Sequence, residues 1–191
     1  MISRIRLPLL LLALLSWAST VAAQQQPTVV ILVRHAEKVA PNPPDGDPEL
    51  TEAGRVRARA LADALADAGV DAVITSQFKR TRFTAAPLAE KLGLTPEIVS
   101  TSGAQAQPEA VAQSIRANHA GQTVLVVGHS NTIPAVIAAL GGPRLEEICD
   151  SQYADFFVLV LGAGDRPSLI RSTYGAPSPA PGPECQRAMR Q

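Results

Sequence analysis

Short apolar runs alternate with amphipathic stretches along the chain. The clearest runs, at residues 29–33 and 123–127, are continuous and rich in β-branched residues. Such runs are typical of strands buried on both faces of a parallel sheet. Shorter runs at 71–75 and 97–99 predict two more strands. Apolar residues at helical spacing predict helices over about 51–69, 76–92, 108–119 and 130–140.

The alternation of strands and helices predicts the fold class. It indicates an α/β protein, a three-layer α/β/α sandwich with a mostly parallel sheet. The last two predicted strands, 153–161 and 168–173, are joined by a short Gly-rich turn at 162–165. A short turn between neighbouring strands predicts an antiparallel edge strand. Pro87 is expected to kink or divide its helix, because proline disrupts the helical hydrogen-bond ladder.

The N-terminal segment predicts export. Arg4 and Arg6 precede an apolar run from Leu7 to Trp17, and small residues lead to Ala23. This pattern is typical of a cleaved secretory signal peptide, here residues 1–23. The apolar run is shorter than the ~20 residues that cross a bilayer. We therefore expect a periplasmic or secreted protein with no stable membrane association after cleavage.

The rest of the chain is predicted to form one domain, residues 28–174, followed by a Pro-rich C-terminal tail, residues 175–191. Cys149 and Cys185 are the only cysteines. In an oxidising compartment an even pair favours a disulfide, and two unpaired thiols are the alternative. A disulfide would tie down the tail, whose composition otherwise predicts disorder.

The charge balance excludes some classes of partner. The chain has 17 basic and 17 acidic residues. Without residues 1–23, which include Arg4 and Arg6 and no acid, 15 basic residues remain against 17 acidic ones. This balance does not favour a nucleic-acid-binding or anionic-membrane surface. Any anion site must therefore be local.

Polar residues follow three of the predicted strands. The carboxyl ends of parallel strands share one sheet edge, so these residues are expected to converge there. Arginines, histidines and helix N-termini around one crevice predict a site for a phosphate-like dianion, because a guanidinium grips phosphoryl oxygens in pairs. The residues are Arg34, His35, Ser76, Arg80, His129 and Asn131.

One imidazole in this group can act as a nucleophile. Nearby guanidinium charges disfavour protonation of His35, which should be neutral near pH 7. A neutral imidazole can attack phosphorus and form a covalent phosphohistidine. Arg34, Arg80 and His129 would stabilise the charge on the equatorial oxygens. No metal or other cofactor is required, and the two arginines would repel a cation.

The motifs resemble those of one family. Arg-His-Ala-Glu at 34–37 is similar to the Arg-His-Gly-Glu signature of the histidine phosphatase superfamily, the phosphoglycerate mutase-like proteins. Leu50–Gly54, Ser76 with Arg80, and Val127–His129 match further family features in order and spacing. The resemblance covers residues 28 to about 174. It implies an α/β/α sandwich, with His35 as nucleophile and Arg34, Arg80 and His129 as the phosphate pocket. The shortness of the domain predicts that no cap domain is inserted.

The proton donor is unassigned at this stage. Family members with a clear donor carry an acidic residue after the second arginine, where this chain offers only Glu90 and Glu97. A donor is needed to protonate an alkoxide unless the leaving group is good. The Pro-rich loop 39–50 is expected to border the site. The remaining candidate acids are Glu37, Asp45, Asp47 and Asp155.

These observations predict a metal-independent phosphomonoester hydrolase that acts on a small phosphorylated substrate through a phosphohistidine on His35. One alternative is a non-catalytic exported domain that binds a phosphorylated ligand. The lack of an obvious proton donor favours that alternative. The other is a phosphomutase of the same fold, which would need a clamp for a second substrate that the sequence does not show.

Overall fold

The computed structural model describes residues 26–100, 106–162, 166–180, 182 and 185. The predicted signal peptide, residues 163–165 of the predicted turn and part of the tail lie outside them. The strands are β1 (Thr28–Arg34), β2 (Ala72–Thr75), β3 (Glu97–Ile98), β4 (Thr123–Gly128), β5 (Asp155–Leu161) and β6 (Ser168–Thr173). The helices are α1 (Glu52–Leu65), α2 (Lys79–Leu92), α3 (Ala106–Asn118) and α4 (Thr132–Ala139).

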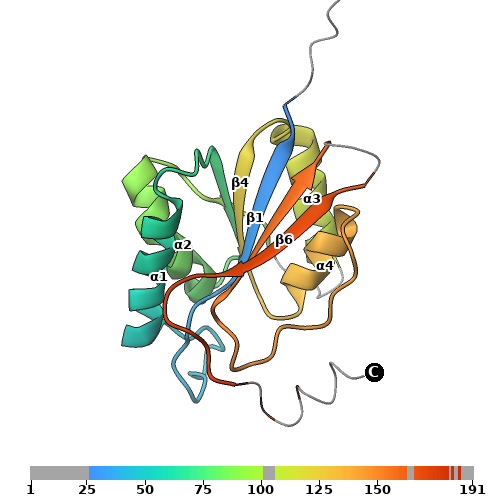
Figure 1. Cartoon of the computed structure of the whole chain (residues 1–191). Coiled ribbons are helices and arrows are strands. Elements are labelled where there is room, and N and C mark those ends of the chain that lie inside the picture. The colour runs from blue at the N-terminus through green and yellow to red at the C-terminus, as the bar shows by residue number, and fades with distance from the viewer. Residues whose placement is uncertain (1–25, 101–105, 163–165, 181, 183–184, 186–191) are drawn as a thin grey trace, which may run out of the picture.

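The six strands form one sheet in the order β3-β2-β4-β1-β5-β6 (Figure 1). The first four of these strands are parallel. Strand β5 runs antiparallel to both β1 and β6, which confirms the antiparallel edge. Helices α1 and α2 lie on one side of the sheet and α3 and α4 on the other (Figure 1). The predicted α/β/α sandwich is therefore confirmed.

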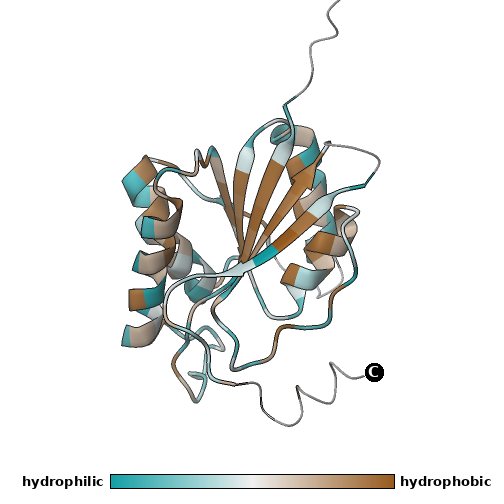
Figure 2. Ribbon diagram, in the orientation of Figure 1, coloured by the Kyte–Doolittle hydropathy of each residue, from teal (hydrophilic) through white to brown (hydrophobic). Residues whose placement is uncertain are grey.

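The alternation of side chains along the strands builds two cores. In β1, Val30 and Leu32 pack into the core under α3 and α4, whereas Ile31 and Val33 pack into the core under α1 and α2. Figure 2 shows the inner strands as almost continuously hydrophobic. A sheet covered on both faces needs apolar side chains at every position, which explains the unbroken apolar runs.

Pro87 does not divide its helix, which was one of the two predicted outcomes. It lies inside α2, which runs unbroken from Lys79 to Leu92, and residues on both sides of it, Ala85 and Leu88, are fully buried. Packing of both halves against the sheet offsets the lost backbone hydrogen bond. At α4, the N-cap residue Asn131 makes no side-chain cap hydrogen bond. Among the described residues, none of the helices has the length and apolar character needed to cross a membrane.

Candidate active site

The predicted residues converge at the carboxyl ends of β1, β2 and β4. Register fixes this arrangement, because Arg34 lies opposite Gly128 and Thr75 lies opposite Val127. The next residues, His35, Ser76 and His129, therefore leave the sheet at the same edge. A cavity of about 390 Å³ opens there. Its lining includes Arg34, His35, Lys38, Phe78, Arg80, Gln107, His129, Ser130, Asn131, Thr132 and Asp150.

His35 is buried and lines this cavity. Its Nδ1 lies 2.8 Å from the carbonyl oxygen of Ala36. A carbonyl only accepts hydrogen bonds, so Nδ1 carries the ring proton and Nε2 keeps a lone pair. Burial lowers the pKa of His35 to about 3, and Arg34, His129 and Arg80 act in the same direction. His35 is thus neutral at pH 7 as predicted, but burial is a larger cause than the arginines.

His129 is held beside His35 by a chain of hydroxyl groups. The two imidazole centroids are 5.4 Å apart. Nε2 of His129 lies 3.0 Å from Oγ of Ser76, which lies 2.8 Å from Oγ1 of Thr81. Burial lowers the pKa of His129 to about 4, with smaller effects from Arg80 and Arg34. The backbone N–H of His129 donates to the hydroxyl of Thr132 at the start of α4, which holds the backbone of His129 at the helix N-terminus.

Arg34 is held by a loop that follows α4. Its Nη1 donates to the carbonyl oxygens of Cys149 (2.8 Å), Asp150 (3.0 Å) and Gln152 (3.3 Å). Its Nη2 donates to Oδ1 of Asp150 at 3.1 Å, and the ring of Tyr153 lies 4.3 Å from the guanidinium carbon. Nε is buried without a partner. Nη1 is therefore fully used by the protein, and Nη2 and Nε are the groups that remain for an anion.

Arg80 also lines the cavity and is half-buried, with its guanidinium carbon 4.2 Å from the centre of the Phe78 ring. Its Nη1 is 3.8 Å from Oδ1 of Asp47. The same carboxylate oxygen accepts a hydrogen bond from the backbone N–H of Lys79 at 2.9 Å and thereby caps α2. The Pro-rich loop 39–50 thus borders the site through Asp47, whose carboxylate forms an ion pair with Arg80.

None of the candidate proton donors lines the cavity, although Asp47 lies beside Arg80. Glu37 forms a two-pronged ion pair with Arg57, with N–O distances of 2.8–3.0 Å. Asp155 is buried against Arg171. Asp45 is 3.6 Å from Lys79, and Asp47 is used as described above. Glu90 lines other cavities, and Glu97 is bound to His119 and Ser114.

Sequence reasoning missed several residues of the cavity. Among the acids of the described residues, only Asp150 lines it, and its side chain is 98% exposed. Gln107, at the start of α3, is buried with its Oε1 unpartnered. No motif precedes either residue. Lys38 could have been found, because it directly follows the 34–37 signature. Asn131, one of the residues predicted to converge, lines the cavity and is exposed.

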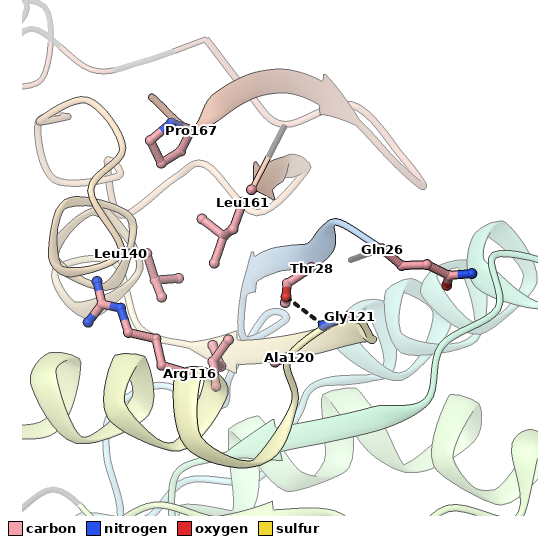
Figure 3. Close-up of a pocket in the computed structure, with 10 residues that line it drawn as sticks. Gln26, Thr28, Arg116, Ala120, Gly121, Leu140, Leu161 and Pro167 are labelled. Atoms are coloured by element: carbon pink, nitrogen blue, oxygen red, sulfur yellow. Dashed lines mark hydrogen bonds between the residues drawn. The ribbon is translucent and has the colours of Figure 1, made fainter. Parts of the chain in front are cut away.

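A larger cavity, of about 480 Å³, lies at the opposite end of the sheet (Figure 3). Thr28, at the start of β1, and Leu161, at the end of β5, both line it. Its one charged residue among those described, Arg116, donates to the carbonyl oxygen of Ala139 at 2.6 Å. The histidines and Arg80 are at the other edge. This cavity therefore lacks the grouped ionisable residues of the 390 Å³ cavity.

Comparison with known proteins agrees with this geometry. The model of the histidine phosphatase superfamily (branch 1) matches residues 30–103. The chain is 30% identical to a putative phosphohistidine phosphatase SixA from Agrobacterium tumefaciens, over 79% of this chain and 99% of that one, with a TM-score of 0.57. No curated protein sequence matches the chain.

Two more distant structures share the fold. A mycobacterial glucosyl-3-phosphoglycerate phosphatase is 18% identical over 78% of this chain and all (100%) of that one, with a TM-score of 0.57. A phosphoserine phosphatase from Entamoeba histolytica is 15% identical over 78% and 98% of the two chains, with a TM-score of 0.55. From the family model and the SixA match together, the chain belongs to the histidine phosphatase superfamily.

Proposed function

We propose that this protein is a metal-independent phosphatase that hydrolyses small phosphomonoesters through a covalent phosphohistidine on His35. One observation carries the proposal. The buried, neutral His35 has its Nδ1–H fixed by the Ala36 carbonyl, so its Nε2 lone pair is free in a cavity with two arginines and a second histidine. The relatives named above as phosphatases support the same class of reaction.

In the first step, Nε2 of His35 attacks phosphorus and the bond from phosphorus to the leaving oxygen breaks. Arg80, together with Nη2 and Nε of Arg34, would hold the equatorial oxygens, whose charge grows in the transition state. Asn131 and the N-terminus of α4 lie at the rim of the cavity and would add N–H donors. A dianion beside His129 favours its protonated form, which would then donate a hydrogen bond.

In the second step, water attacks phosphorus, the N–P bond breaks, and inorganic phosphate leaves with His35 restored to its neutral form. The described residues offer no acid that is clearly placed to protonate the first leaving group. Asp150, the acid that lines the cavity among those described, is exposed and paired with Arg34. Because this carboxylate is already bound to Arg34, the site favours substrates whose leaving group departs without a proton.

Hydrolysis of p-nitrophenyl phosphate tests the proposal, because nitrophenolate needs no proton to leave. We expect turnover by the wild-type protein, a loss of at least about 1000-fold in His35→Ala, and little change in His119→Ala. His119 is a matched control because it is bound to Glu97 and Gln122, away from the cavity. Tight binding of inorganic phosphate without turnover would instead favour the non-catalytic binding domain.

The phosphomutase alternative makes a different prediction. A mutase passes the phosphoryl group to a second hydroxyl of a substrate rather than to water. Release of one inorganic phosphate for each nitrophenolate, unchanged by adding a sugar or glycerate acceptor, would exclude it.

A further inference from the structure

The C-terminal tail packs along the loop that holds Arg34. We call residues 149–154 the arginine loop, and residues 175–180 together with Cys185 the strap. Oγ of Ser178 accepts hydrogen bonds from the backbone N–H groups of Tyr153 and Ala154, both at 2.9 Å. The side-chain amide of Gln152 donates to the carbonyl of Pro179 at 2.5 Å. The Cys149–Cys185 disulfide makes a third link, with the Cα atoms 5.8 Å apart.

Arg57 also holds the first residues of the strap. Nη1 of Arg57 donates to the carbonyl oxygens of Tyr174 (3.1 Å) and Ala176 (2.9 Å), while its other nitrogens hold Glu37. Glu37 lies two residues after His35. Arg57 therefore connects the start of the strap to the segment that carries the nucleophile. The strap is anchored at its origin by Arg57 and further along by Ser178 and the disulfide.

The strap and Arg34 use the same short loop. The carbonyls of Cys149, Asp150 and Gln152 bind Nη1 of Arg34, and two of these residues also bind the strap through their side chains. Tyr153, whose ring stacks on the guanidinium, binds the strap through its N–H. The arginine loop lies outside helices and strands. Loops without ladder hydrogen bonds are mobile unless other contacts hold them.

We propose that Ser178 and Cys185 are positioning residues: through the arginine loop, the strap fixes the carbonyls that aim Arg34 at the phosphoryl group. The inference rests on the proposed function, in which Arg34 binds phosphate. Misplacing the guanidinium would weaken phosphate binding in the ground state and in the transition state. If the strap only stabilised the fold, loss of its contacts would lower the melting temperature and leave the kinetics below that temperature unchanged.

Substitution of Ser178 separates these roles. Ser178→Ala removes the acceptor for two backbone N–H groups, and Ser178→Thr keeps it. Ser172→Ala is the control, because Ser172 is exposed on the edge strand β6. Well below the melting temperature, we expect Ser178→Ala to raise KM for p-nitrophenyl phosphate and Ki for inorganic phosphate by about five- to tenfold, because about 1 kcal/mol corresponds to a fivefold change in affinity. Ser178→Thr should restore both constants.

The disulfide gives a second, independent measurement. Loss of the disulfide should raise the same two constants, KM and Ki. We expect this both in the folded wild-type protein reduced with dithiothreitol and in the Cys149→Ser/Cys185→Ser double variant. Wild-type values in the folded Ser178→Ala protein and in the reduced protein would overturn the proposal. If the wild-type protein does not hydrolyse p-nitrophenyl phosphate, calorimetric binding of inorganic phosphate still tests the strap, so its failure is distinguishable from that of the proposed function.

Discussion

The behaviour of each site residue depends on which of its polar atoms the protein already uses. His35 gives Nδ1–H to a backbone carbonyl, and only its second nitrogen is free for chemistry. Arg34 gives Nη1 to three carbonyls, and its Nη2 is shared with Asp150. In the proposed function, a phosphate dianion would compete with the exposed carboxylate of Asp150 for Nη2 of Arg34.

This competition predicts that Asp150→Asn strengthens phosphate binding. The substitution removes a negative charge beside the dianion and leaves Nη2 of Arg34 with a weaker neutral partner. We expect Ki for inorganic phosphate to fall by about two- to fivefold at low salt, and by less at high salt because exposed charges are screened. Inhibition assays at two ionic strengths measure this.

Asp67→Asn is the matched control, because Asp67 is exposed just beyond the C-terminal end of α1 and changes the net charge equally. Unchanged phosphate affinity, with turnover lost only for alkyl phosphates, would contradict this interpretation. It would instead identify Asp150 as the proton donor.

The residues at strand ends could be predicted from sequence, and the arginine loop could not. Arg34, His35 and His129 follow continuous apolar runs that predict strands, and parallel pairing brings the ends of these strands together. Asp150 and Tyr153 lie in a segment with no periodicity, and their positions depend on contacts with the tail. Long-range contacts of irregular loops leave no local pattern to detect.

At the scale of elements, the first turn of α1 holds the segment that follows His35. The carbonyl oxygen of Glu37 accepts from both the N–H and the hydroxyl of Thr51, and that hydroxyl accepts from Gly54 N–H. A Cβ on Gly54 would lie 2.2 Å from the same carbonyl oxygen. The Leu50–Gly54 motif thus needs threonine as a cap and glycine for close approach.

Gly54→Ala is therefore expected to act against the usual helix propensity. In an unobstructed helix, glycine to alanine stabilises by about 1 kcal/mol. Here the added methyl meets backbone that cannot move cheaply, so we expect destabilisation by about 2–3 kcal/mol and a shift of the His35 segment that lowers turnover. Urea unfolding and p-nitrophenyl phosphate kinetics measure the two effects.

The neighbouring exposed residue Ala53 provides the control for Gly54→Ala. Ala53→Gly should cost about 0.5–1 kcal/mol from propensity alone and leave turnover intact. A more stable or equally stable Gly54→Ala protein would refute the close-approach argument.

At the scale of the whole molecule, the site joins distant parts of the chain. β1 leads directly into His35, the proposed nucleophile, β4 leads into His129, and the C-terminal strap holds the loop behind Arg34. The strap links a tail whose composition predicted disorder to the most buried charge of the site. This assembly buries two histidines in their neutral forms, which should lower the free energy of unfolding at acidic pH.

The whole-molecule prediction is a loss of stability below pH 6.5. Burial lowers the pKa of His35 to about 3 and that of His129 to about 4, from ordinary values of 6.5. Between these values the unfolded chain binds more protons than the folded one, so stability is full above pH 6.5 and falls as the pH falls. From pH 7.5 to 5, above the range in which most carboxylates titrate, each histidine should contribute a loss of roughly 2 kcal/mol. His35→Asn should remove about half of this loss in urea unfolding, whatever its stability at pH 7.5, whereas an equal loss in variant and wild type would show that His35 is protonated in the folded protein.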